Sequence, residues 1–113
     1  MTTLYGIPNC DTVKKARAWL DQRGVAYAFH DYKKAGVDEA ALRGWVARVG
    51  WEKLLNRAGT TFRKLPDEAK AGLDAEKAIG LMLANPSAIK RPVVTKGDAL
   101  LVGFDAAQYE TLV

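Results

Sequence analysis

The sequence has 113 residues, of which 49% are hydrophobic and 27% charged, with a formal net charge of +4, as expected for one soluble domain with a substantial core. No apolar run approaches the about 18 residues that a membrane span needs, and no basic region followed by an apolar stretch predicts a signal peptide. A single cysteine excludes an internal disulfide and favours a reducing compartment, so we expect a cytoplasmic protein.

The N-terminal third predicts a strand, a helix and a second strand. Thr2–Gly6 reads as a short strand, which a turn-like stretch follows. Asp11–Gln22 carries apolar residues at a spacing of three and four, which predicts a helix that Gly24 ends. Val25–Tyr32 is rich in Val, Tyr and Phe and predicts the second strand. A strand–helix–strand unit of this length predicts that the two strands are parallel.

The middle of the chain predicts helices. Asp38 is placed to open one helix, Trp51–Asn56 predicts a shorter one, and Asp74 is placed to cap a third. Gly59–Pro66 reads as a loop, and Pro86 ends the helical region.

The C-terminal part predicts a hairpin and a final helix. Val93–Thr95 and Ala99–Val102 are apolar runs on either side of a Gly-Asp turn, a pattern typical of antiparallel strands. Asp105 and Gln108 have the spacing of a capping box.

The order of these elements predicts an α/β protein with the thioredoxin-like fold. Its mixed four-stranded sheet combines a parallel half with a C-terminal hairpin. We interpret residues 1–113 as a single domain with a helical insertion at about residues 38–85.

The only cysteine lies where chemistry is expected. Cys10 falls in the loop between the first strand and the first helix, next to the helix N-terminus. Unpaired N–H groups and the helix dipole stabilise a thiolate there, and the thiolate is the reactive form of cysteine. The alternative is that Cys10 is a small buried apolar residue, which is common for lone cysteines.

The residues after Cys10 refine this hypothesis. Thr12 can donate a hydrogen bond to the thiolate or stabilise the helix start, and Lys14 can add positive charge, whereas Asp11 opposes ionisation if it faces the sulfur. Val13 stands where C-x-x-C proteins carry their second cysteine, so a redox cycle must end through an external thiol such as glutathione or a glutaredoxin.

Three blocks of sequence resemble the ArsC/Spx/YffB family of thioredoxin-like proteins: Tyr5–Ala16, Leu54–Thr60 and Ile89–Val94. The blocks span almost the whole chain in the family's order. Within the family the chain looks most like the YffB-type members, which are proposed to be glutathione-dependent thiol reductases.

The resemblance implies a set of site residues. Cys10 would be the nucleophile, and Arg91, joined to Pro92 by the cis peptide that the family pattern implies, would bind an anion. Arg57 is the candidate second arginine, although strict alignment puts Asn56 at that position. Thr12, Lys14 and Pro92 complete the candidate substrate-binding residues.

Two departures from the arsenate reductase pattern favour a carboxylate-bearing substrate such as glutathione over arsenate. The family's third arginine would fall in Val102–Phe104, which contains none, and a histidine that precedes the cysteine would fall at Gly6.

We therefore predict an enzyme, a thiol reductase that uses glutathione as co-substrate and has no bound cofactor and no metal. Its substrate is expected to be a small anion or a disulfide. The alternatives are an Spx-like regulator that binds RNA polymerase and a genuine arsenate reductase. Lys and Arg occur at most in pairs, so we expect no nucleic-acid binding. We expect no membrane partner and a monomer, and we interpret the lone His30 as structural.

Overall fold

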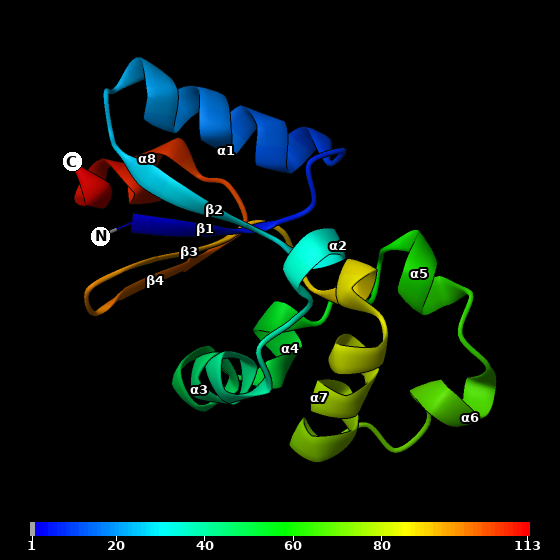
Figure 1. Ribbon diagram of the computed structural model, residues 1–113. Helices are drawn as coiled ribbons and strands as arrows, with labels where there is room; N and C mark the ends of the chain where they lie inside the picture. Colours follow the sequence, from blue (N-terminus) through cyan, green and yellow to red (C-terminus); the bar gives the residue numbers. More distant parts are fainter. Residues whose placement is uncertain (1) are drawn as a thin grey trace. The chain divides into compact units, whose positions relative to one another are not determined.

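The computed structural model describes residues 2–113, which divide into two compact units (Figure 1). The first unit comprises the chain up to Gly36 together with Arg91–Val113, and the second comprises Val37–Lys90. The sheet belongs to the first unit, and the second consists mainly of helices. Within residues 2–113, no helix is both long and apolar enough to cross a membrane.

The first unit contains one mixed four-stranded sheet in the order β2-β1-β3-β4. The strands are β1 (Thr2–Gly6), β2 (Tyr27–Asp31), β3 (Val93–Lys96) and β4 (Ala99–Val102). β1 is parallel to β2, and β3 forms an antiparallel hairpin with β4, as predicted. β1 also pairs with β3 in the antiparallel sense. Gly6 pairs with Asp31, and Tyr5 pairs with Val93. The ends of β1 and β2 and the start of β3 therefore meet at one edge of the sheet.

Helical segments from both ends of the first unit cover one face of this sheet (Figure 1). They are α1 (Asp11–Gln22), α8 (Ala106–Tyr109) and the 3-10 helix η2 (Glu110–Leu112). The buried residues that they share with the sheet are Leu4, Val13, Ala16, Leu20, Val94, Tyr109 and Leu112. The apolar spacing that predicts α1 thus becomes its buried stripe.

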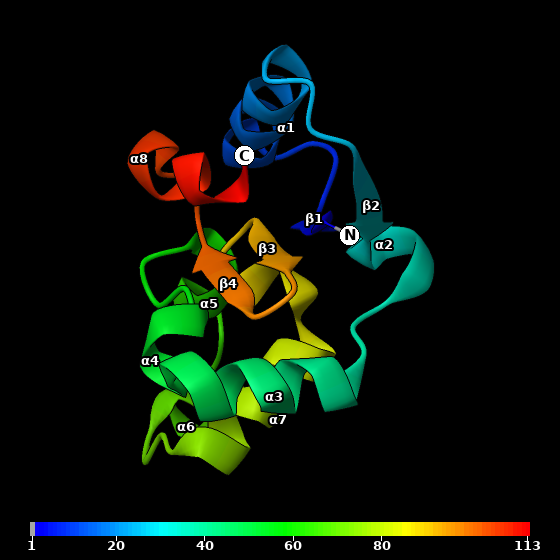
Figure 2. The same cartoon turned by 90° about the vertical axis from the view of Figure 1, so that its left-hand side faces the viewer.

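The second unit holds the helices between Gly36 and β3 (Figure 2). They are α3 (Glu39–Val49), α4 (Trp51–Leu54), α5 (Thr60–Arg63), α6 (Asp67–Lys70), α7 (Ala75–Ala84) and the 3-10 helix η1 (Pro86–Ala88). Asp38 and Asp74 are N-caps as predicted, accepting hydrogen bonds from the amides of Ala40 at 3.1 Å and Lys77 at 2.8 Å. Capping satisfies amides that the first turn leaves unpaired.

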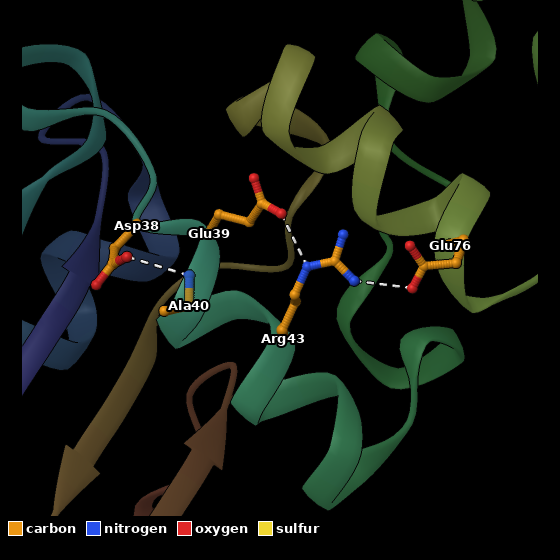
Figure 3. A network of polar contacts seen from close by, with 5 residues as sticks. All are labelled: Asp38, Glu39, Ala40, Arg43 and Glu76. Carbon is orange, nitrogen blue, oxygen red and sulfur yellow. Dashed lines mark hydrogen bonds and ion pairs between the residues drawn. The ribbon is translucent and has the colours of Figure 1, made fainter.

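An exposed ion network connects α3 with α7 in this unit (Figure 3). Arg43 donates hydrogen bonds of 2.8 Å to a carboxylate oxygen of Glu39 and to one of Glu76. Because these side chains are exposed, water screens the ion pairs, and their contribution to stability is small. The packing of buried residues such as Leu42 and Trp45 holds the helices together instead.

The prediction of a loop over Gly59–Pro66 is wrong, because α5 (Thr60–Arg63) lies inside it. Phe62 is buried in this short helix, and burial of an aromatic side chain outweighs the weak helical preference of the two threonines beside it.

Other element boundaries also differ from the prediction: β2 begins at Tyr27 rather than Val25, and β3 extends to Lys96. The second strand ends at Asp31, whose side chain accepts a hydrogen bond from the Lys33 amide at 2.8 Å and so starts α2 (Tyr32–Ala35). The helix predicted for Trp51–Asn56 stops at Leu54, because Leu55 pairs with Ile89 in an isolated antiparallel bridge.

Candidate active site

Cys10 forms the junction between β1 and α1. After β1 the chain turns, and the Cys10 amide donates a hydrogen bond of 3.3 Å to the carbonyl of Ile7. The Cys10 backbone is extended, with φ −101° and ψ 126°, and its carbonyl accepts the first helical hydrogen bond, from Lys14 at 2.9 Å. Cys10 is therefore the N-cap of α1, and its partly exposed sulfur lies beside the helix N-terminus.

The surroundings of the sulfur favour its ionised form. Burial opposes ionisation, but the hydrogen bonding and charge of the Arg91 side chain and the nearby amides of Val13 and Thr12 outweigh it. The pKa of the Cys10 thiol is therefore lowered from its ordinary value. A lowered pKa on an accessible sulfur is the property of a reactive cysteine rather than of a buried structural one.

Arg91 enters the site from the start of β3. It lies in the first unit with Cys10, is half-buried, and precedes a cis peptide bond to Pro92. Pro92 is buried, and its carbonyl accepts a hydrogen bond of 2.8 Å from the amide of Gly103. The structure thus brings Arg91 to the thiol; the roles of Arg91 and Pro92 toward a substrate stay predictions.

The other candidate residues lie in different surroundings. The backbone amide of Thr12 is among the groups that lower the pKa of Cys10, and a role for its side chain stays a prediction. Lys14 is exposed in the first turn of α1. Arg57 belongs to the second unit, where its guanidinium lies 5.6 Å from the centroid of the Trp51 ring. Substrate binding by these side chains stays a prediction.

Comparison with known proteins identifies the family of this chain. The profile of the ArsC family matches residues 5–112. The chain belongs to the ArsC family. The solved structure named YFFB protein is 58% identical, with a TM-score of 0.96 over 98% of this chain and 97% of that chain. An arsenate reductase (ArsC) related protein from Brucella melitensis is 56% identical, with a TM-score of 0.78 over 97% of this chain and 92% of that one.

Curated relatives of this ArsC-family chain differ in what their names say. An uncharacterized protein of Haemophilus influenzae is 39% identical over 110 residues, which cover 97% of this chain and 96% of that protein. The global transcriptional regulator Spx of Streptococcus mutans is 27% identical over 107 residues, covering 93% of this chain and 77% of the regulator. The predicted family and the thioredoxin-like α/β fold are thereby confirmed.

His30 has a structural place next to the site. Its Nε2 atom lies 2.8 Å from the carbonyl oxygen of Gly36, and its ring lies 5.1 Å from that of Tyr5 and 5.8 Å from that of Tyr32. Among residues 2–113, no group of three or more His, Cys, Asp or Glu side chains is arranged to hold a metal ion. These contacts agree with the structural interpretation of His30.

Sequence reasoning missed Tyr32, which lies at the same edge of the sheet as Cys10. The side chain is 3% exposed, and its hydroxyl has no hydrogen-bond partner among the described residues. Burial raises the pKa of Tyr32, as does the nearby Tyr5 hydroxyl, while the charge of Arg91 opposes the rise. One signal was available: in parallel strands, the residue directly after β2 lies beside the loop that leaves β1.

Replacing Tyr32 by phenylalanine is expected to raise the free energy of unfolding by about 1 kcal/mol, because it removes a buried hydroxyl that lacks a partner. Urea denaturation measures the change. Tyr109→Phe is the matched control: the Tyr109 hydroxyl donates a hydrogen bond of 2.7 Å to the carbonyl of Gly103, so its loss should destabilise by about 1 kcal/mol. Equal destabilisation by both substitutions would contradict the description of Tyr32.

Proposed function

We propose that this ArsC-family chain is a thiol-dependent oxidoreductase in which Cys10 is the nucleophile and glutathione restores its thiolate. The observation that carries the proposal is the set of groups on the Cys10 sulfur, namely the Arg91 side chain and the amides of Thr12 and Val13. They stabilise a thiolate at a partly exposed position, where an electrophile can reach it.

Reduction of a glutathionyl mixed disulfide illustrates the proposed reaction. The Cys10 thiolate attacks the glutathione sulfur, the S–S bond breaks, and the substrate leaves as a thiolate that takes up a proton. The new disulfide between Cys10 and glutathione is then attacked by the thiolate of a second glutathione. This step forms oxidised glutathione and returns Cys10 as a thiolate. Overall, the mixed disulfide and one free glutathione thiol become the substrate thiol and oxidised glutathione, so the second glutathione supplies the reducing equivalent.

An external thiol is required because Cys10 is the only cysteine of the chain. A glutaredoxin could take the place of the second glutathione. We propose that Arg91 binds a carboxylate of the glutathionyl group, because a guanidinium matches the two oxygens of a carboxylate. We propose further contacts to the anionic substrate from Thr12, Lys14 and Arg57. Pro92 is proposed to contact the substrate next to Arg91.

The test uses a model protein glutathionylated on one cysteine, incubated with the purified chain and no other thiol. We expect mass spectrometry to show one glutathionyl group transferred to Cys10 and the model protein released as a free thiol. Cys10→Ser is the control and should transfer nothing. Adding reduced glutathione should then return Cys10 to the free thiol. Absence of transfer to the wild-type chain over the uncatalysed rate would reject the proposal.

The relatives named Spx support a second candidate, a regulator of transcription. This candidate needs no turnover at Cys10, and the predicted partner is RNA polymerase. Binding of the purified chain to RNA polymerase, undisturbed by Cys10→Ser, would favour it over the reductase. The relative named as arsenate reductase related supports arsenate as an alternative substrate, which single-turnover reduction with glutathione would test.

A further inference from the structure

Gly6, the last residue of β1, lies against the first turn of α1. A Cβ atom built on Gly6 would lie 2.8 Å from Cγ2 of Val13 and 3.6 Å from its Cγ1. Carbon atoms in contact are separated by about 3.5–4.0 Å. Gly6 and the Val13 side chain are therefore complementary, and a methyl group at position 6 requires Val13 to move away by about 1 Å.

Val13 has little freedom to move by itself. Its side chain is 0% exposed and packs in the core that α1 shares with the sheet, including Leu4, Ala16 and Leu20. A β-branched side chain in a helix has one strongly preferred rotamer, and close-packed cores transmit strain. A displacement of the Val13 side chain is therefore passed to its own backbone.

The backbone of Val13 belongs to the site. Its amide lies in the first turn of α1 and is one of the groups that lower the pKa of the Cys10 thiol, with the amide of Thr12 and the side chain of Arg91. The stabilisation that an amide N–H gives to a thiolate falls steeply as distance and angle depart from their optimum. The residue whose side chain contacts Gly6 is thus the same residue whose amide helps to stabilise the sulfur.

We propose that Gly6 is a positioning residue for Cys10: its missing side chain leaves the space that Val13 fills, and this contact sets where the first-turn amides lie relative to the sulfur. The proposal rests on the proposed nucleophilic role of Cys10 but not on glutathione. It makes positions 6 and 13 a coupled pair, in which a side chain at position 6 is compatible with the site only if position 13 becomes smaller.

The test compares Gly6→Ala with the double variant that also carries Val13→Ala. Thiolate absorbance against pH measures the pKa of Cys10 in each protein. Gly6→Ala is expected to raise this pKa and, at a pH below it, to reduce the thiolate fraction about fivefold, the loss of roughly one hydrogen bond. The double variant removes both Val13 methyl groups, so its thiolate fraction should return to within about twofold of the wild type.

Leu20→Ala controls for general destabilisation. Leu20 is buried in the same core but lies near the other end of α1, so this variant should lose stability and keep the thiolate pKa of the wild type. If Gly6→Ala unfolds the chain, refolding of the double variant with a wild-type thiolate pKa supports the proposal.

An unchanged thiolate pKa in a folded Gly6→Ala variant would overturn the proposal, and so would failure of Val13→Ala to rescue either the pKa or the folding. The wild-type titration separates this outcome from failure of the proposed function. An unperturbed pKa in the wild-type chain counts against the nucleophile itself, whereas a lowered pKa that ignores Gly6→Ala counts only against the positioning role.

Discussion

The Arg91→Ala variant is expected to alkylate more slowly than the wild-type chain at pH values below the pKa of the Cys10 thiol. Arg91 donates a hydrogen bond to the thiolate and adds a positive charge beside it, so its removal raises this pKa. Because Cys10 is partly exposed, water screens these interactions. The expected loss of thiolate stabilisation is therefore about 1 kcal/mol, or about fivefold in thiolate fraction. A thiolate of higher pKa is also more nucleophilic, and this offsets about half of the fall in alkylation rate on a logarithmic scale.

The pH profile therefore carries the sign of the effect. With iodoacetamide, a neutral reagent, Arg91→Ala should be about two- to threefold slower at low pH and faster than the wild type once both thiols are ionised. With iodoacetate, which is anionic, the variant also loses the attraction of the guanidinium for the reagent. The deficit should then reach about tenfold and should shrink as salt is added.

Arg23→Ala is the matched control for Arg91→Ala. Arg23 carries the same charge but lies at the C-terminal end of α1, where it pairs with Glu110. Its removal should leave the alkylation profile of Cys10 unchanged. Equal profiles for wild type and Arg91→Ala with both reagents would show that Arg91 neither stabilises the thiolate nor attracts anions.

The largest expected loss of stability is that of Leu4→Ala, about 3 kcal/mol. Leu4 is 0% exposed on β1, one of the two interior strands, opposite Phe29 of β2 and Val94 of β3. Truncation leaves a cavity at the position where the sheet meets α1, and neighbours on two strands limit how far the core can collapse. The loss is a large part of the about 5–15 kcal/mol that stabilises a typical domain.

Leu4→Ile provides the comparison for this prediction, because it keeps the side-chain volume and suits a strand. It should cost less than about 1.5 kcal/mol. Urea denaturation followed by far-ultraviolet circular dichroism measures both stability losses. A loss below 1 kcal/mol for Leu4→Ala, or equal losses for both variants, would contradict the assignment of Leu4 to a close-packed core.

Local sequence patterns predicted most elements because the forces that form them act over a few residues. The spacing of apolar residues predicted α1 with its observed bounds, and Asp38 and Asp74 predicted the starts of α3 and α7. The prediction was wrong for Thr60–Arg63, where local preference is weak and the burial of Phe62 decides the conformation. Burial depends on residues distant in sequence, which a local pattern does not contain.

The candidate site divides in the same way. The sequence by itself determined that Cys10 begins a helix after a strand, and hence that helix amides lie beside its sulfur. Only the tertiary structure decided that Arg91, 81 positions later in the chain, reaches that sulfur and that the buried Tyr32 lies within reach of the Arg91 charge. The pairing of β1 with β2 and β3 brings the three segments to one edge of the sheet. The tertiary structure also decided that the missing side chain of Gly6 leaves room for the Val13 methyl groups, a steric relation that no residue pattern records.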